Sequence, residues 1–148
     1  MDGVGLRPAT DGDIELVYRI TEDAMRGYVE ATWGRWESDE QREYCRRSFS
    51  TGTHRIVQVD GEDVGVLAVA EHPTHVQLEK LYLLAASRRR GVGSELLPRV
   101  LGVGQSAGLP VRLRVLAVNI AAQRFYARHG FTVSEHTAER VFMERAYE

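Results

Sequence analysis

Residues 88–94 read Arg-Arg-Arg-Gly-Val-Gly-Ser and lie between an apolar run, Val76 to Leu84, and a segment of helical periodicity, Glu95 to Ala107. This order predicts a strand, a glycine-rich turn and a helix. Gly91 and Gly93 carry no Cβ, so the backbone there can come close to a ligand and direct several N–H groups the same way. Because these donors precede the positive end of a helix and stand beside three arginines, the stretch predicts a phosphate or pyrophosphate site.

The residues around this turn exclude two familiar phosphate motifs. A P-loop needs a longer loop that ends in Gly-Lys-Ser or Gly-Lys-Thr, which this stretch does not contain. The dinucleotide fingerprint needs a third glycine, which is also missing. Glycine pairs at a strand-to-helix turn are common by themselves, so the rest of the chain decides what the site binds.

The composition describes one ordinary globular domain, residues 1–148. The hydrophobic fraction of 43% and the charged fraction of 27% suit a chain that buries its own core. A net charge of −2 and an isoelectric point near 6.2 argue against general nucleic-acid binding, which brings a basic excess. We therefore expect no nucleic-acid partner, and the three arginines are a local feature.

Cysteine, lysine and histidine usage limits the chemistry further. The single cysteine, Cys45, has no partner for an internal disulfide, and Lys80 is the only lysine, which argues against lysine-dependent covalent catalysis. The five histidines show no metal-ligand spacing, so we expect no metal. Met1-Asp2-Gly3 starts no positively charged signal segment, and no apolar run approaches the ~20 residues of a membrane span. These features predict a cytoplasmic protein without a membrane partner.

Local patterns predict an alternation of strands and helices. Asp60-Gly61 is a strong hairpin signal, and the run Val76 to Leu84 is apolar on both faces, as expected of a central strand. Pro98 lies inside a helical segment and predicts a kink. The predicted strands cover residues 6–9, 54–59, 64–70, 76–84, 111–118, 131–137 and 140–145, and the predicted helices cover residues 14–28, 38–49, 95–107 and 119–129.

A second motif reads Val115-x-x-x-Asn119-x-x-Ala122-x-x-Phe125-Tyr126-x-x-x-Gly130-Phe131. Together with Arg88-x-x-Gly91-x-Gly93 and the order of the elements, it resembles the GCN5-related N-acetyltransferase (GNAT) superfamily over nearly the whole chain. The resemblance implies a single-domain α/β (α+β) fold. Its sheet would be mixed, mostly antiparallel, twisted and flanked by about four helices, and it would splay open in a V.

The resemblance also implies that acetyl-CoA (coenzyme A) binds in this splay. Carried over by position, backbone N–H groups of the glycine-rich turn would hold the pyrophosphate, and main-chain groups of the central strand would pair with the pantetheine arm. The N–H of Leu83 would polarise the thioester carbonyl, and Asn119 would bond the arm or cap a helix. The implied cofactor-binding residues are Leu81, Tyr82, Leu83, Arg88, Arg89, Arg90, Gly91, Val92, Gly93, Ser94, Asn119 and Tyr126.

Two residues are candidates for catalytic proton transfer. Acyl transfer to an alkylammonium, whose pKa is about 10 in water, needs a base for the amine and an acid for the departing thiolate. Tyr126 suits the acid role, because the resemblance places it near the sulfur, but it could equally be a core residue. Glu79 is the candidate base, because a carboxylate that shares a strand face with Leu81 and Leu83 would be partly desolvated. A structural ion pair of Glu79, or a water relay in its place, is the alternative.

The aromatic segment around Gly34 is the candidate substrate-binding site, because the resemblance places the acceptor wall between the first two helices. Tyr28, Trp33 and Trp36 could pack an aliphatic or cationic acceptor, and Glu30 could attract its amine. The same aromatic side chains could instead fill a hydrophobic plug under a loop.

The sequence thus predicts an acetyl-CoA-dependent N-acetyltransferase that acetylates a primary amine of a small molecule by direct attack on the thioester. A peptide or protein acetyltransferase that modifies N-termini or lysines is one alternative. A non-catalytic acyl-CoA-binding sensor is another. Folds of the family often pair through sheet edges, so a homodimer is also compatible with the sequence.

Overall fold

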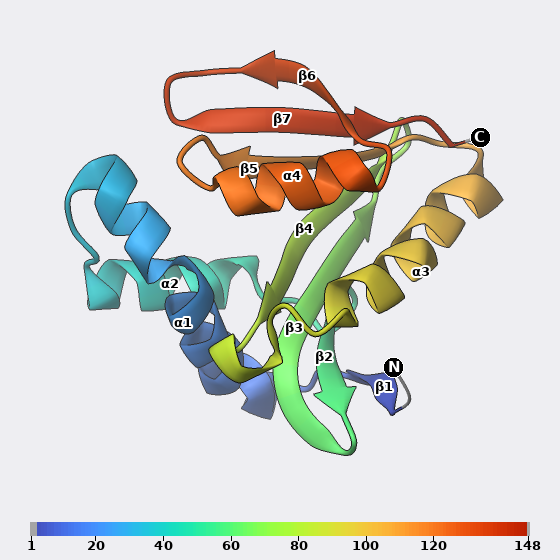
Figure 1. Cartoon of the computed structure of the whole chain (residues 1–148). Coiled ribbons are helices and arrows are strands. Elements are labelled where there is room, and N and C mark those ends of the chain that lie inside the picture. The colour runs from blue at the N-terminus through green and yellow to red at the C-terminus, as the bar shows by residue number, and fades with distance from the viewer. Residues whose placement is uncertain (1–2, 148) are drawn as a thin grey trace.

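A seven-stranded mixed sheet forms the centre of the protein (Figure 1). The computed structural model describes residues 3–147. The strand order is β1-β2-β3-β4-β5-β7-β6, and every neighbouring pair is antiparallel except β4 and β5. The strands are β1 (Val4–Pro8), β2 (His54–Val59), β3 (Glu62–Glu71), β4 (Val76–Leu83), β5 (Val111–Leu116), β6 (Thr132–His136) and β7 (Arg140–Arg145). The helices are α1 (Ile14–Trp33), α2 (Ser38–Ser48), α3 (Val92–Ala107) and α4 (Ile120–Arg128), with short 3-10 turns η1 (Asp11–Asp13) and η2 (Ala85–Ser87).

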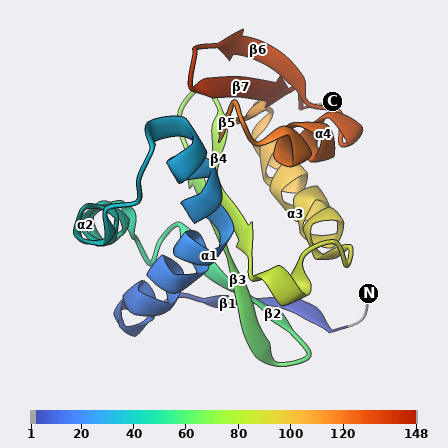
Figure 2. The same ribbon diagram turned by 60° about the vertical axis from the view of Figure 1, so that its left-hand side comes forward.

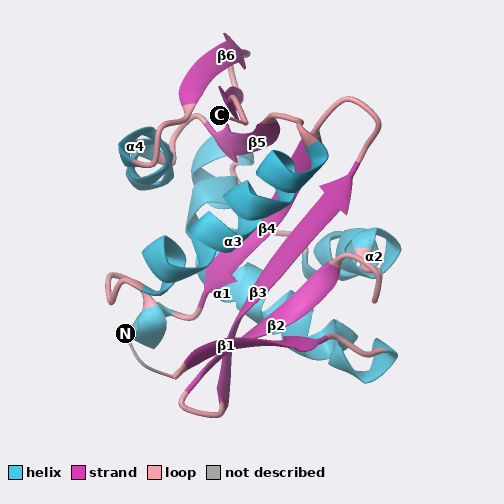
Figure 3. Cartoon of the chain, turned by 90° about the vertical axis from the view of Figure 1, so that its right-hand side faces the viewer, coloured by secondary structure: helices cyan, strands magenta, loops and turns pink. Residues whose placement is uncertain are grey.

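Helices cover both faces of the sheet, so the protein has three layers. Helices α1 and α2 lie on one side of β4, and α3 and α4 lie on the other (Figure 2). The view in Figure 3 looks onto α3, with the sheet behind it and α2 behind the sheet. Separate apolar clusters fill the two spaces between the layers, one around Leu96 and Leu97 of α3 and one around Val17 and Ile20 of α1. This architecture confirms the α/β class expected from the resemblance.

The β2–β3 hairpin forms at the predicted turn. Asp60 has φ 52° and Gly61 has φ 84°, which are the positive angles that a tight two-residue hairpin turn requires. The hairpin aligns Val59 with Glu62, and the ladder continues to the pair His54 and Ala68. The turn therefore sets the register next to it, and a bulge at Val57/Gln58 shifts the register by one residue for the rest of the ladder.

β4 and β5 are joined at one end only. Their parallel ladder consists of the pairs Val76–Val111 and Gln77–Arg112, although both strands continue for several residues beyond it. The N–H of Val76 also donates to the carbonyl of Pro110 at 2.9 Å. The two strands diverge past this point, which confirms the V-shaped splay.

A β-bulge in β4 corrects the predicted faces of this strand. Ala68 pairs with Lys80 and Val69 pairs with Leu78, so Glu79 is left over in the register. Strict alternation predicts that Leu78 shares a face with Tyr82. Instead Leu78 lies in the α3-side cluster, whereas Tyr82 packs against the α1-side cluster. One extra residue in the strand shifts every later side chain to the opposite face.

The first helix is longer than its periodicity suggests. It continues past Tyr28 to Trp33 and ends at Gly34, whose φ of 87° is a left-handed stop. The predicted aromatic loop is therefore mostly helical. Its helical character is hidden in the sequence because Gly27 and a run of aromatic and β-branched residues have low helix propensity, whereas burial of Val29 holds the helix in place.

Helix α3 starts one turn earlier than predicted and runs through Pro98 as a single element. Pro98 is exposed, so water can reach the carbonyl group that lacks its usual donor. The buried side chains of Val92, Leu96 and Val100 hold the helix against the sheet. In the described part of the chain, none of the helices has the length and apolar character needed to cross a membrane.

Candidate active site

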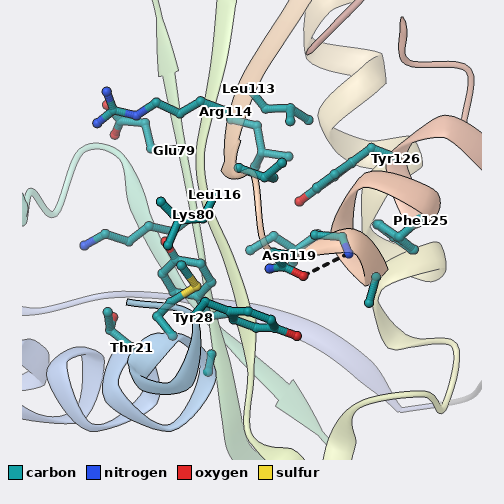
Figure 4. Close-up of a pocket in the computed structure, with 18 of the residues that line it drawn as sticks. Thr21, Tyr28, Glu79, Lys80, Leu113, Arg114, Leu116, Asn119, Phe125 and Tyr126 are labelled. Atoms are coloured by element: carbon teal, nitrogen blue, oxygen red, sulfur yellow. Dashed lines mark hydrogen bonds between the residues drawn. The ribbon is translucent and has the colours of Figure 1, made fainter. Parts of the chain in front are cut away.

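The splay between β4 and β5 opens into a cleft of about 2610 Å³ that continues between α1, α2 and the edges of the sheet. Figure 4 draws part of its lining, with Tyr126 and Phe125 on one side of the strands and Glu79, Lys80 and Arg114 on the other. Every predicted site residue lines this cleft except Glu30 and Arg90. The topology therefore brings the two sequence motifs and the aromatic segment to one site.

The glycine-rich turn presents a row of free backbone donors. Within residues 3–147, the N–H groups of residues 89–94 have no acceptor in the chain, because the first bond of α3 runs from Glu95 N–H to the Gly91 carbonyl at 3.0 Å. Arg89 and Gly91 both have positive φ, 61° and 80°, which turns neighbouring N–H groups in a common direction. These donors stand at the positive end of α3, so the turn is suited to an anion such as a pyrophosphate.

The two glycines of the turn serve different purposes. Gly91 is the left-handed residue that starts α3, and a Cβ there would meet no atom within 4 Å. Gly93 is needed for packing, because its Cβ would lie 3.1 Å from Cζ of Phe125 on α4. Gly93 thus also lets α4 pack closely on α3, in addition to the predicted role of its backbone in the turn.

Arg88 is held at the entrance of the turn by two acceptors. Its Nη1 donates to the carbonyl of Leu83 at 3.3 Å, and its Nη2 lies 3.5 Å from Oδ2 of Asp23 on α1. The same Asp23 oxygen accepts the backbone N–H of Ala85 at 3.0 Å. Asp23 is not recognisable as a site residue in the sequence, because nothing near it on α1 indicates contact with a turn more than sixty residues away.

β4 turns main-chain groups that have no strand partner towards the splay, although the Leu83 carbonyl accepts a hydrogen bond from Arg88. Leu84 N–H donates to the carbonyl of Val64, and bonding positions alternate along an antiparallel strand. The main chain of Tyr82 therefore faces β3, whereas the main chains of Leu81 and Leu83 face the gap beside β5. An extended chain could pair with Leu81 and Leu83 as an added strand. The main chain of Tyr82, which the sequence included in this role, pairs with Val66 of β3 instead.

Tyr126 and Asn119 line the opposite side of the splay. Tyr126 is 7% exposed, burial raises the pKa of its phenol above the ordinary value, and its hydroxyl points towards the middle of the pocket in Figure 4. Its ring packs edge-on against Phe125 and Phe131, so it is a core residue as well as a cleft residue. Asn119 Oδ1 accepts the N–H of Ala122 at 3.1 Å, which confirms it as the N-cap of α4.

Glu79 and Lys80 are neighbours in β4 with opposite environments: the Glu79 side chain is exposed and the Lys80 side chain is buried. Glu79 lies in the bulge with its side chain exposed to the cleft, so the prediction of a partly desolvated carboxylate is wrong. Lys80 is 8% exposed, and its Nζ donates to Oγ of Ser48 at 3.3 Å. Burial lowers the pKa of the Lys80 ammonium. No ion pair joins Glu79 to Lys80 among the residues described.

The aromatic segment divides into a wall and a core. Trp36 is 7% exposed and its Nε1 donates to the Tyr18 hydroxyl at 3.1 Å, as in the hydrophobic-plug alternative. Trp33 is 45% exposed, and the guanidinium of Arg140 lies 5.3 Å from its ring centroid. Glu30 pairs with Arg26 on the outer face of α1 and does not line the cleft.

Comparisons with known proteins agree with this geometry. Residues 15–131 match the profile of the acetyltransferase (GNAT) family. The chain belongs to this family. A curated relative, an uncharacterized N-acetyltransferase of Mycobacterium tuberculosis, is 36% identical over 91 residues, which are 60% of this chain and 55% of the relative. The chain thus spans little more than half the length of the curated GNAT relatives that it matches.

Solved GNAT structures share the fold over almost the whole chain. The PaiA N-acetyltransferase of Thermoplasma acidophilum, in complex with coenzyme A, has a TM-score of 0.75 at 18% identity and covers 97% of this chain and 99% of its own. The ribosomal-protein-S18-alanine N-acetyltransferase of Escherichia coli has a TM-score of 0.72 at 15% identity and covers 98% of this chain and 94% of its own. The seven-stranded sheet and its four helices are therefore a GNAT fold.

Proposed function

We propose that the protein is an acetyl-CoA-dependent N-acetyltransferase that acetylates a primary amine of a small molecule. The observation that carries the proposal is the row of unpaired N–H groups at residues 89–94, placed at the end of the unpaired edge of β4. A pyrophosphate joined to an extended amide-bearing arm fits both features, and the PaiA structure of the same fold contains coenzyme A.

Each part of the cleft has a role in this reaction. The N–H groups of residues 89–94 bind the pyrophosphate, and Arg88 adds a charged donor to it. The main chains of Leu81 and Leu83 hold the pantetheine arm, and the Leu83 N–H, which points into the gap, polarises the thioester carbonyl. Acetyl-CoA supplies an activated acetyl group, whose C–S bond breaks as the new C–N bond forms.

Two protons move during the transfer. The acceptor amine must lose a proton, and Glu79, the one of several cleft carboxylates that lies on β4, can take it, directly or through water. The departing sulfur must gain a proton, and Tyr126 is suited to donate one because its raised pKa keeps the phenol protonated. No covalent bond to the enzyme is required.

The test is titration with acetyl-CoA in a calorimeter, followed by a thiol-release assay on small amines and peptide N-termini. Binding with turnover of a small amine supports the proposal. Turnover of peptide N-termini alone would assign the protein to the alternative class of peptide acetyltransferases. Tight binding without any turnover would favour a sensor, and a lack of binding would contradict the assignment of residues 89–94.

A further inference from the structure

Three cationic side chains face the part of the cleft beyond the splay, on the side of α1 and α2. Leu116 of β5 belongs to the α1-side cluster, and Arg114, two residues earlier, lies on the same face. Arg140 of β7 pairs directly with Leu116 and shares that face as well. Lys80 reaches the same region from β4, and all three residues line the cleft. Figure 4 draws Lys80 and Arg114 on the side of the strands opposite Tyr126.

Lys80 is the most informative of the three because it is buried. Its side chain is 8% exposed, yet one acceptor, the Ser48 hydroxyl, lies within hydrogen-bond distance in the part of the chain that the structure describes. An ammonium has three donors, so two remain for a ligand. The position at the last residue of α2 favours a positive charge, because carbonyl groups point out of that helix end.

Glu79 lies close enough to favour the positive charge of Lys80. Even so, Lys80, Arg114 and Arg140 have no carboxylate at ion-pair distance, within 4.0 Å, among residues 3–147. Arg112, the next arginine on the same face of β5, differs from them because it forms an ion pair: its Nε lies 2.8 Å from Oε2 of Glu144. Of the three, Lys80 is buried, Arg140 is half-buried and Arg114 is exposed. A buried charge without a counter-charge is costly, so Lys80, with the two arginines on the same side of the cleft, indicates an anionic ligand.

The aromatic wall of the cleft argues in the same direction. Arg140 already lies over the ring of Trp33, at 5.3 Å from its centroid. A cationic acceptor that stacked on this ring would have to approach a guanidinium, which repels it. The arrangement therefore disfavours a polyamine and favours an acceptor whose far end is negative.

We propose that the acceptor is an amino acid, and that Lys80, Arg114 and Arg140 bind its carboxylate while its amine faces Glu79 and the thioester. This inference rests on the proposed function, because it names the substrate class of that same site. Glu79 and Lys80 are consecutive residues at the bulge of β4 and both line the cleft, so the strand contributes a carboxylate for the amine and a cation for the carboxylate.

The test compares each free L-amino acid with its α-amide, which keeps the amine and side chain but removes the negative charge. For the preferred acceptor, kcat/KM of the acid should exceed that of the amide at least tenfold. The ratio should fall close to one in Lys80→Met and severalfold in Arg114→Gln and Arg140→Gln. Arg112→Gln is the matched control, because its charge is already paired, and it should keep the wild-type ratio.

Binding supplies a second readout that does not require turnover. In calorimetry on protein saturated with coenzyme A, N-acetyl amino acids should bind and the corresponding N-acetyl amides should bind at least tenfold more weakly. If Lys80→Met fails to fold by circular dichroism, the two arginine variants carry the test. Preference for amides, polyamines or peptide N-termini, no binding by any carboxylate, or an unchanged ratio in the variants would overturn the inference. Acetyl-CoA binding with turnover of amides would leave the proposed function intact, whereas failure to bind acetyl-CoA would remove that function itself.

Discussion

Oδ2 of Asp23, on helix α1, lies 3.5 Å from Nη2 of Arg88, on the turn that precedes α3. The same carboxylate accepts the Ala85 N–H, so one side chain ties the acceptor-side helix to the entrance of the phosphate-binding turn. Both groups are about 40% exposed, which makes the ion pair itself weak. In the proposed complex, Arg88 would exchange this carboxylate for a pyrophosphate.

Replacement of Arg88 should therefore weaken acetyl-CoA binding. The charged hydrogen bond that is lost is worth about 1.5–3 kcal/mol, so Arg88→Ala should raise Kd roughly tenfold or more. Asp23→Asn keeps an acceptor for Ala85 but removes the competing charge, and it should lower Kd by about two- to fivefold. Calorimetric titration at low and high salt measures both effects. Equal affinity of Arg88→Ala and wild type would show that the arginine does not reach the ligand.

Removal of the Tyr126 hydroxyl should slow the chemical step without affecting cofactor binding. If the phenol donates the proton to sulfur, Tyr126→Phe should lower kcat by about 100-fold, the lower bound for a general acid, and leave Kd for acetyl-CoA nearly unchanged. The raised pKa of Tyr126 also means that its ionisation does not limit kcat up to about pH 10. An unchanged kcat in the variant would return Tyr126 to a purely structural role in the core.

Two glycines of α3 provide a matched test of packing. A Cβ at Gly104 would lie 2.8 Å from the carbonyl oxygen of Leu109 and 2.9 Å from Cγ2 of Val111, whereas a Cβ at Gly102 would meet no atom within 4 Å. Gly104→Ala should therefore destabilise the protein by about 1–3 kcal/mol through overpacking. Gly102→Ala should stabilise it by about 0.5–1 kcal/mol through helix propensity. Urea denaturation of both variants measures the difference, and shifts of the same sign would contradict it.

Stability should fall on mild acidification because of His54. This side chain is 0% exposed, its Nε2 has no hydrogen-bond partner among the described residues, and burial lowers its pKa to about 4. The unfolded chain, with a pKa near 6.5, binds the proton more tightly than the folded protein. Above pH 6.5 both states hold His54 neutral, and the free energy of unfolding is at its full value. As the pH falls from 6.5 towards 4, the free energy of unfolding decreases by about 3 kcal/mol.

The control for this prediction is His54→Phe, which keeps a ring beside Phe49 and has no titratable group. The free energy of unfolding, measured by urea denaturation between pH 4 and pH 7, should depend on pH much less in this variant. A slope equal to that of wild type would assign the acid sensitivity to other groups.

Much of the fold could be predicted because its signals are local. Asp60-Gly61 predicts the hairpin, and Asn119 predicts the start of α4. Gly130 and Phe131 mark the end of α4: Phe131 is 2% exposed, and its N–H donates to the carbonyl of Tyr126. The two motifs around the splay were found for the same reason. Each is a run of residues whose backbone needs are visible in the sequence itself.

The unpredicted features depend on contacts between distant segments. The bulge at Glu79 is set by how β3 pairs with β4, and no residue in β4 predicts it. The burial of Lys80 follows from that bulge together with the position of Ser48, thirty-two residues away. The extension of α1 to Trp33 depends on tertiary burial that overrides weak local propensity. Such features arise only when the chain is assembled.

The ladder between β4 and β5 is short, so the sheet has a gap between these two strands where hydrogen bonds would otherwise continue. Its two residue pairs, Val76–Val111 and Gln77–Arg112, form the hydrogen-bonded junction between the first four strands and the last three. A molecule that occupies the gap and bonds to both sides supplies the missing ladder from outside the chain. Such a molecule binds only the folded protein, so its binding free energy adds to the free energy of unfolding. Saturation with it should therefore slow amide exchange on β5 and β7 as well as at the residues it touches.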